Sequence, residues 1–256
     1  MEPIIFVLLF FIIMGIAFIS SMVGIGGGTF LVPLLILGFG FSPAEAAGTS
    51  SMYIWINAIS ATYAYHRKGK VLFKPGLILE LMTVPGAFIG AYLTIIIPEV
   101  GLKMLLATVL ALTAIRMLTS RNSNVNNKNC TGNFMNGLDK VKLFVALLGA
   151  FLAGIISGAL GVGGGTIKVP ILHFLLGVPM DYAAATSTFM ILLTSFSASI
   201  EHILLGHVDF LIVTTIIPGA IIGSQLGPRF ALSIPKNRLK QVFGIILLIV
   251  VCLLLF

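Results

Sequence analysis

Two stretches decide the fold: "GIGGGTFLVPLL" at residues 24–35 and "GVGGGTIKVPIL" at residues 161–172. They align without a gap, and 8 of their 12 positions are identical. Each places four glycines within five positions of a strongly apolar sequence. Glycine weakens a helix, and backbone groups released from a helix are costly in hydrocarbon. The break therefore serves a purpose, either close packing of helices or contact with a ligand.

The two stretches belong to a longer internal repeat. The same offset of 137 residues places "AAGTSS" at 46–51 on "AAATST" at 183–188. Further along, "PGAFIGAYL" at 85–93 matches "PGAIIGSQL" at 218–226, with an offset four residues smaller. Because the matches extend over a whole half, the chain consists of two copies of one unit.

The composition predicts an all-α membrane protein. Of 256 residues, 58% are hydrophobic and 9% are charged, whereas soluble domains carry roughly 25% charged residues. We expect a first transmembrane repeat at 1–119, a polar linker at 120–140 and a second transmembrane repeat at 141–256. The net charge of +7 does not indicate nucleic-acid binding, because the basic residues lie in short loops, where they set membrane orientation. The start of the chain lacks the basic region of a signal peptide and is expected to be a retained helix.

Each half contains five apolar segments. The expected ten are 4–23, 29–41, 44–65, 75–97, 100–119, 141–160, 166–178, 181–204, 208–228 and 237–256. The second segment of each half has only about a dozen residues, which is short for a span of about 20. We therefore expect it to be a half-helix or a re-entrant segment.

The charges of the loops decide the topology. Lysines and arginines cluster at 66–74, in and beside the linker, and at 229–240, whereas the equivalent loops of the opposite half carry almost none. If all three clusters are cytoplasmic, each half must cross the membrane an odd number of times. The sequence thus predicts about ten transmembrane segments in two inverted-topology repeats of five, with both termini outside.

Inverted repeats with interrupted helices are an architecture of secondary transporters. Clustered glycines expose backbone N–H groups, and the helix that follows favours an anion at its N-terminus. Threonine hydroxyls at these helix starts can serve as caps or as ligand donors. We expect the two helix starts to converge on one pocket lined by Gly26, Gly27, Gly28, Thr29, Gly163, Gly164, Gly165 and Thr166.

These residues resemble the TauE/SafE sulfite exporter family. The resemblance is carried by the paired glycine stretches, the "AAGTSS" and "AAATST" segments, the "PGAFIG" and "PGAIIG" segments and the two-halved design. It covers all of the chain except the linker. It implies a membrane transporter of small sulfur-containing anions, such as sulfite, sulfonates or related organic anions.

Several polar residues inside the segments are further candidates. Lys168 is an intramembrane cation and so a candidate anion contact, with snorkelling to the interface as the alternative. Ser50 and Ser187 open the third segment of each half, where they either line the site or satisfy backbone carbonyls. Glu80 lies one turn inside the fourth segment and is expected to pair at the surface with a lysine or arginine of the 66–74 loop.

Four residues are candidates for coupling to a proton, namely Glu80, His173, Glu201 and His202. His173 follows Lys168 in the same short segment, and histidine changes charge near neutral pH. Glu201 and His202 lie near the end of the eighth segment, where a water-exposed interfacial pair is the main expectation.

We expect no cofactor, no metal site and no catalytic set, and hence no enzyme. The leading hypothesis is a secondary transporter working by alternating access, in contact with the bilayer and a small anion. An anion channel and an intramembrane enzyme or assembly subunit are the alternatives. The protein is expected to be a monomer or a homodimer.

Overall fold

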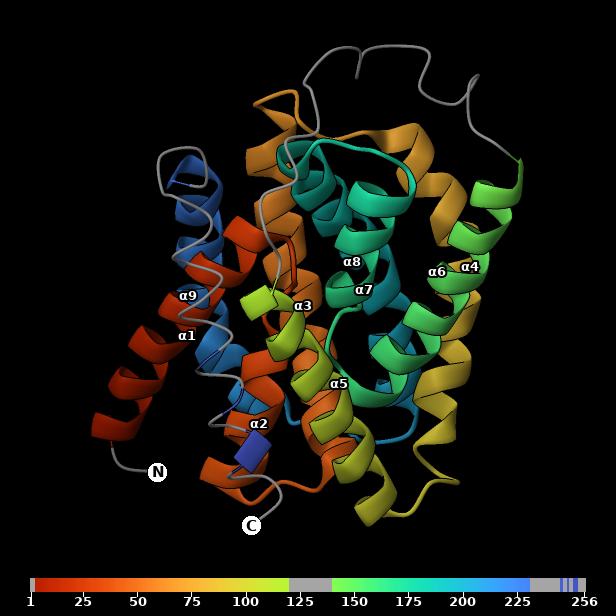
Figure 1. The fold of residues 1–256 in the computed structure, drawn as a ribbon. Coiled ribbons are helices and arrows are strands. Elements are labelled where there is room, and N and C mark those ends of the chain that lie inside the picture. Colours follow the sequence, from red (N-terminus) through yellow and green to blue (C-terminus); the bar gives the residue numbers. More distant parts are fainter. Residues whose placement is uncertain (1–2, 120–139, 231–244, 246–247, 249–250, 253–256) are drawn as a thin grey trace.

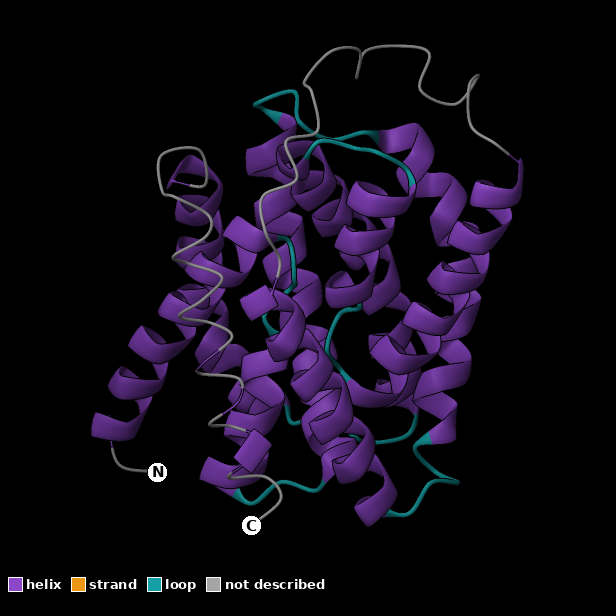
Figure 2. Ribbon diagram, viewed as in Figure 1, coloured by secondary structure: helices purple, strands orange, loops and turns teal. Residues whose placement is uncertain are grey.

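The computed structural model is a bundle of helices whose bounds follow the predicted segments closely (Figure 1). It describes residues 3–119, 140–230, 245, 248 and 251–252, and no strand occurs among them (Figure 2). The all-α prediction is confirmed for this part of the chain. Most of the linker and of the tenth segment, 237–256, lies outside the described residues. The elements are α1 (Pro3–Val23), α2 (Gly28–Phe39), α3 (Pro43–His66), α4 (Phe73–Leu93), α5 (Glu99–Thr119), α6 (Lys140–Leu160), α7 (Gly165–Pro170), the π-helical η1 (Ile171–Leu175), α8 (Met180–Leu204) and α9 (Phe210–Phe230).

The second segment of each half is short. Helix α2 has 12 residues, or about 18 Å at 1.5 Å per residue, against a hydrocarbon core of about 30 Å. It ends at Gly40, which adopts the left-handed conformation of a C-terminal glycine cap. In the second half, α7 gives way to η1 directly after Pro170, whereas α2 continues through the equivalent Pro33. By contrast, α4, α6, α8 and α9 are long and apolar enough to cross a membrane.

The outer helices of each half pack against the other half. The most extensive contacts join α1 to α9 and α4 to α6, so the first helix of each half packs on the fourth helix of the other. Glycines allow backbones to touch there: a Cβ on Gly90 would lie 2.0 Å from the Ile155 carbonyl oxygen, and one on Gly227 would lie 2.3 Å from the Phe18 carbonyl oxygen. The "PGAFIG" and "PGAIIG" segments are thus small-residue packing surfaces.

This packing corrects the alignment of those segments. Gly90 and Gly227 occupy equivalent places, because Ile155 and Phe18 are themselves separated by 137 residues. The sequence match had paired Gly90 with Gly223 instead, one helical turn away. A glycine repeated every four residues makes such a slip invisible in the sequence.

Helices α3 and α8 pack against each other between these outer pairs (Figure 1). Helix α3 starts with a capping box, in which Ser42 and Glu45 bond each other's backbone N–H groups. Trp55 of α3 packs on Phe196 of α8, with 5.1 Å between ring centroids. Trp55 is the single tryptophan, so its fluorescence reports on this central contact.

Two basic regions meet at one end of the bundle. The α3–α4 loop, the start of α6 and the end of α9 lie at the top of Figure 1, and the α2–α3 and α8–α9 loops lie at the bottom. The Lys68 ammonium donates a hydrogen bond to the Pro228 carbonyl. Partial burial and the positive charge of Arg229 lower the pKa of Lys68. The 66–74 loop therefore adjoins the start of the 229–240 cluster, whose remainder lies outside the described residues.

Candidate functional site

The glycine loops, residues 24–28 and 161–165, interrupt the helices inside the bundle, and every residue in them is buried. Gly26 and Gly27 have φ angles of 94° and 92°, and Gly163 and Gly164 have φ angles of 84° and 67°. Side chains rarely adopt this left-handed conformation, so glycine is required there. Helices α2 and α7 start directly after Gly27 and Gly164.

The two loops touch each other across the halves. A Cβ on Gly28 would lie 2.1 Å from the Gly161 carbonyl oxygen, and a Cβ on Gly165 would lie 2.4 Å from the Gly24 carbonyl oxygen. The structure thus brings the two glycine loops into contact, and the expected pocket between the helix starts stays a prediction. It also shows that Gly28 and Gly165 serve close packing in this conformation.

Paired serines hold the loops in place. Ser50 donates a hydrogen bond of 2.7 Å to the Gly161 carbonyl, and Ser187 donates one of 2.9 Å to the Gly24 carbonyl. Both serines come from a central helix, α3 or α8, and each bonds the loop of the opposite half. Of the two alternatives for Ser50 and Ser187, the structure shows the second, in which the hydroxyl bonds a backbone carbonyl.

Paired threonines repeat this arrangement at the fourth helices. Thr49 accepts a hydrogen bond of 3.0 Å from the Asp209 N–H, and Thr186 accepts one of 3.0 Å from the Leu72 N–H. Both bonds join a central helix to the opposite half. These serine and threonine contacts between the halves are therefore duplicated, one copy per half.

The duplicated serines give a first test. Ser50→Ala or Ser187→Ala leaves a buried carbonyl without its donor, and each should lower the free energy of unfolding by about 1–3 kcal/mol. Ser51→Ala is the matched control, since the Ser51 hydroxyl donates only to the Ala47 carbonyl of its own helix. Thermal unfolding in detergent, followed by Trp55 fluorescence, measures all three. Equal stability of Ser50→Ala and Ser51→Ala would show that the loop contact contributes nothing.

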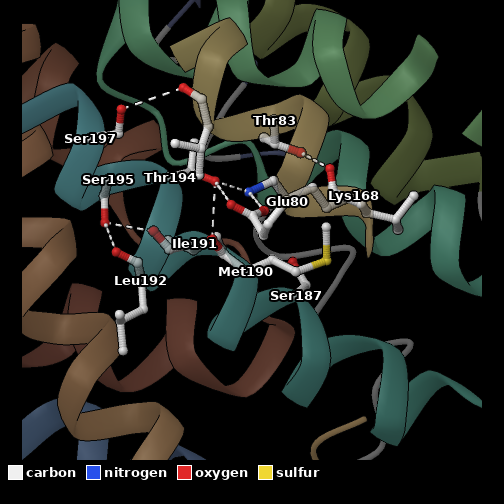
Figure 3. A network of polar contacts seen from close by, with 12 residues as sticks. Glu80, Thr83, Lys168, Ser187, Met190, Ile191, Leu192, Thr194, Ser195 and Ser197 are labelled. Atoms are coloured by element: carbon white, nitrogen blue, oxygen red, sulfur yellow. Dashed lines mark hydrogen bonds and ion pairs between the residues drawn. The ribbon is translucent and has the colours of Figure 1, made fainter. Parts of the chain in front are cut away.

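Next to the second glycine loop lies a buried ion pair (Figure 3). The Lys168 Nζ of α7 lies 2.8 Å from Glu80 Oε1 of α4, and both side chains are almost fully buried, at 0% and 3% exposure. Thr194 of α8 donates to Glu80 Oε2 at 2.7 Å and accepts from Lys168. The predicted surface role of Glu80 is wrong, because α4 turns this residue toward α7 and α8. Snorkelling of Lys168 does not occur in this conformation.

Unlike the serines and threonines, the ion pair is not duplicated. At the 137-residue offset, the first half has Leu31 in place of Lys168 and Asn57 in place of Thr194, and the second half has Ile217 in place of Glu80. A buried ion pair adds little to stability relative to apolar residues of similar size. The Lys168–Glu80 pair, which has no counterpart in the first half, is therefore a candidate for a functional role and not for a stabilising one.

The equivalent place in the first half has unused hydrogen-bonding capacity. Asn57 Nδ2 donates to the Gly26 carbonyl at 3.1 Å. Among the described residues, Asn57 Oδ1 and Thr29 Oγ1 are buried atoms with no hydrogen-bond partner. Thr29 does not cap α2, and no side-chain cap is present at the start of α7 either. Thr166 is half-buried.

Of the four candidates for proton coupling, Glu80 belongs to the ion pair, and the hydrogen bonds described for His173 and His202 go to other groups. His173 is buried in η1, and its Nδ1 lies 2.8 Å from the Val178 carbonyl oxygen. Glu201 and His202 are buried at 6% and 0% exposure, so the expected water-exposed pair is wrong. Their helix end is covered by the α8–α9 loop and by α6.

His202 has a neighbour that sequence analysis did not single out. Its Nε2 lies 2.9 Å from the Gly158 carbonyl oxygen, and its Nδ1 lies 3.3 Å from Nδ1 of His207. A carbonyl only accepts, so Nε2 carries the hydrogen and His207 donates to His202. His207 borders a cavity of about 430 Å³ with Glu45 and Asp209. Burial lowers the pKa of His207, and the negative charge of Glu45 opposes that shift.

A family model described as sulfite exporter TauE/SafE matches residues 9–254. The chain belongs to the TauE/SafE sulfite exporter family. It is 28% identical to the probable membrane transporter protein YunE of Bacillus subtilis, over 93% of both chains. A probable membrane transporter protein of Xylella fastidiosa is 28% identical, over 92% of this chain and 89% of its own. One of Methanocaldococcus jannaschii is 25% identical, over 91% and 88%. No solved structure matches the chain.

This TauE/SafE chain is a multi-pass membrane transporter by family and by its apolar helices. Within the described residues, no group of three or more His, Cys, Asp or Glu side chains is placed to hold a metal ion.

Proposed function

We propose that the protein is a secondary transporter of small sulfur-containing anions, such as sulfite or sulfonates, and that Lys168 and the glycine loops bind the anion. One observation carries the proposal: a fully buried ammonium stands beside the contact between two glycine loops. An intramembrane cation is functional by default. The Cε of Lys168 lies 3.4 Å from the Cβ position of Gly164, so the ammonium and the loop backbone can act on one ligand.

Helix starts support the choice of an anion. The backbone N–H groups of Gly28 and Thr29 have no acceptor within α2, whereas those of Phe30 and Leu31 bond the Gly27 carbonyl. The start of the helix carries the positive end of its dipole. Thr29, in the first turn of α2, adds a buried hydroxyl without a partner among the described residues. A small oxyanion offers acceptors to the N–H groups, the hydroxyl and the ammonium together.

The way in which the halves meet supports alternating access. Inverted repeats of five segments would place the 66–74 and 229–240 clusters on the same, cytoplasmic side. The contact between Lys68 and Pro228 supports that arrangement. The glycine loops touch in this conformation, so an anion reaches Lys168 only when the halves part on one side. The helix pairs α1–α9 and α4–α6 provide two bodies that can move against each other.

Transport by the pure protein tests the proposal. Liposomes containing the protein should take up labelled sulfite, and unlabelled sulfite inside should accelerate that uptake, since a carrier returns faster when loaded. A channel shows no such acceleration, and an intramembrane enzyme alters the sulfite. Liposomes carrying the protein that exclude sulfite, sulfate, thiosulfate, sulfonates and small carboxylates would contradict the proposal.

A further inference from the structure

We propose that Glu80 is an internal substitute for the transported anion. Its carboxylate holds Lys168 while the site is empty, the incoming anion displaces it, and Glu80 then takes up one proton. This inference rests on the proposed function, because it requires Lys168 to bind the anion.

The geometry of the pair supports this exchange. Glu80 presents one oxygen to the Lys168 ammonium at 2.8 Å and the other to the Thr194 hydroxyl at 2.7 Å (Figure 3). A sulfonate or sulfite group also presents several oxygens bonded to one central atom, so it can satisfy the same two donors. Glu80 therefore occupies the place where an oxyanion would bind.

The partners come from different halves of the chain. Lys168 and Thr194 belong to the second half and stay beside its glycine loop. Glu80 belongs to α4 of the first half. A movement of α4 against α7 and α8 separates the carboxylate from the ammonium, and it leaves Lys168 next to the loop that binds the anion.

Among the described residues that face the Glu80 carboxylate, Lys168 is followed by no second cation that could pair with it after displacement. Lys168 faces it from α7, Thr194 from α8 and Thr83 from its own helix. The lysines of α6 are Lys140 and Lys142, both exposed in its first turn. The remaining ionisable residues of α8, namely Asp181, Tyr182, Glu201 and His202, lie toward its two ends.

An uncompensated charge is costly in this surrounding. A proton from the aqueous side to which the site is open therefore binds the Glu80 carboxylate, and no other bond forms or breaks. The empty site holds one positive and one negative charge, and the loaded site holds Lys168, the anion and a neutral Glu80. For a monovalent anion, the net charge of the site is unchanged, so one anion moves with one proton.

The test compares how tightly an anion binds at different pH. Methanesulfonate, sulfate and thiosulfate are the anions of strong acids and stay ionised near neutral pH, so any pH dependence comes from the protein. Titrations followed by Trp55 fluorescence or calorimetry give Kd for the wild type, Glu80→Gln and Glu99→Gln. Glu99 is exposed at the start of α5 and is the matched control.

Binding that takes up one proton becomes weaker as pH rises. The Kd of the wild type and of Glu99→Gln should therefore increase about tenfold for each unit by which pH is raised. Glutamine neither competes for the ammonium nor needs a proton. Glu80→Gln should therefore bind more tightly than the wild type at neutral pH, with the same Kd at every pH.

A wild-type Kd independent of pH, or the same pH dependence in Glu80→Gln, would overturn the inference. If Glu80→Gln does not fold, the wild type decides alone: one proton should disappear from a weakly buffered solution per anion bound. Failure of the proposed function looks different, because then none of the three anions binds any variant.

Discussion

Lys168→Met should lower the free energy of unfolding by about 3–5 kcal/mol, because it leaves the buried Glu80 carboxylate without its cation. The double variant Glu80→Gln/Lys168→Met should regain most of that loss, since neither charge remains. Neither protein should bind the anion, because both lack the ammonium. Unfolding in detergent and anion titration, both followed by Trp55 fluorescence, separate the two effects.

Lys74→Met is the control for this series. Lys74 lies in the first turn of α4, on the same helix as Glu80, and is exposed. Its loss should leave stability and binding unchanged. A Lys168→Met protein as stable as the wild type would show that Glu80 does not depend on Lys168, and a double variant with wild-type anion affinity would remove Lys168 from the site.

Gly28→Ala and Gly165→Ala should each destabilise the protein by about 3 kcal/mol or more, at or beyond the upper end for overpacking. A Cβ at either position would lie within 2.4 Å of a backbone carbonyl of the opposite loop. Neither carbonyl can move freely, because Ser50 and Ser187 hold both of them. Any folded fraction should have parted loops and should transport no anion.

Gly15→Ala is the control for the loop glycines. No atom lies within 4 Å of a Cβ at Gly15, and alanine favours the helix by about 1 kcal/mol over glycine. This variant should be as stable as the wild type or slightly more stable. Wild-type melting temperatures for both Gly28→Ala and Gly165→Ala would contradict the loop contact described here.

Much of the architecture could be predicted from the sequence. The repeat of the glycine stretches, the short second segments and the bounds of the helices follow from apolar length and from glycine and proline positions. Each of these is a local property of the chain. The convergence of the two helix starts follows from the internal repeat, because copies of one unit that share a core bring equivalent segments together.

The position of Glu80 could not be derived in this way. Its distance from the basic loop along the chain suggested a surface partner, whereas the packing of α4 against α8 turns it inward. The sequence does contain one indication of the pair. Glu80 and Lys168 are oppositely charged residues within apolar segments, and charged residues inside a membrane usually pair with each other. The roles of Thr194 and His207 depend on contacts between distant segments, which the sequence does not specify.

The same limit explains the serines. Ser50 and Ser187 were expected either to line the site or to satisfy carbonyls, and both residues bond a carbonyl of the opposite loop. Because the two serines occupy equivalent positions in the two halves, beside the glycine stretches, a role in ligand binding was one of the expectations. In the structure, these duplicated serines support the glycine loops, whereas the Lys168–Glu80 pair has no counterpart at the 137-residue offset.

The position of a bound anion tests the central claim most directly. Selenite is the selenium analogue of sulfite, and an anomalous difference map from crystals grown with it would locate the selenium. We expect one peak within hydrogen-bonding reach of Lys168 Nζ and beside the glycine loops, with Glu80 turned away from the ammonium. A peak only at the cavity bordered by Glu45 and His207, with the Lys168–Glu80 pair intact, would contradict the account.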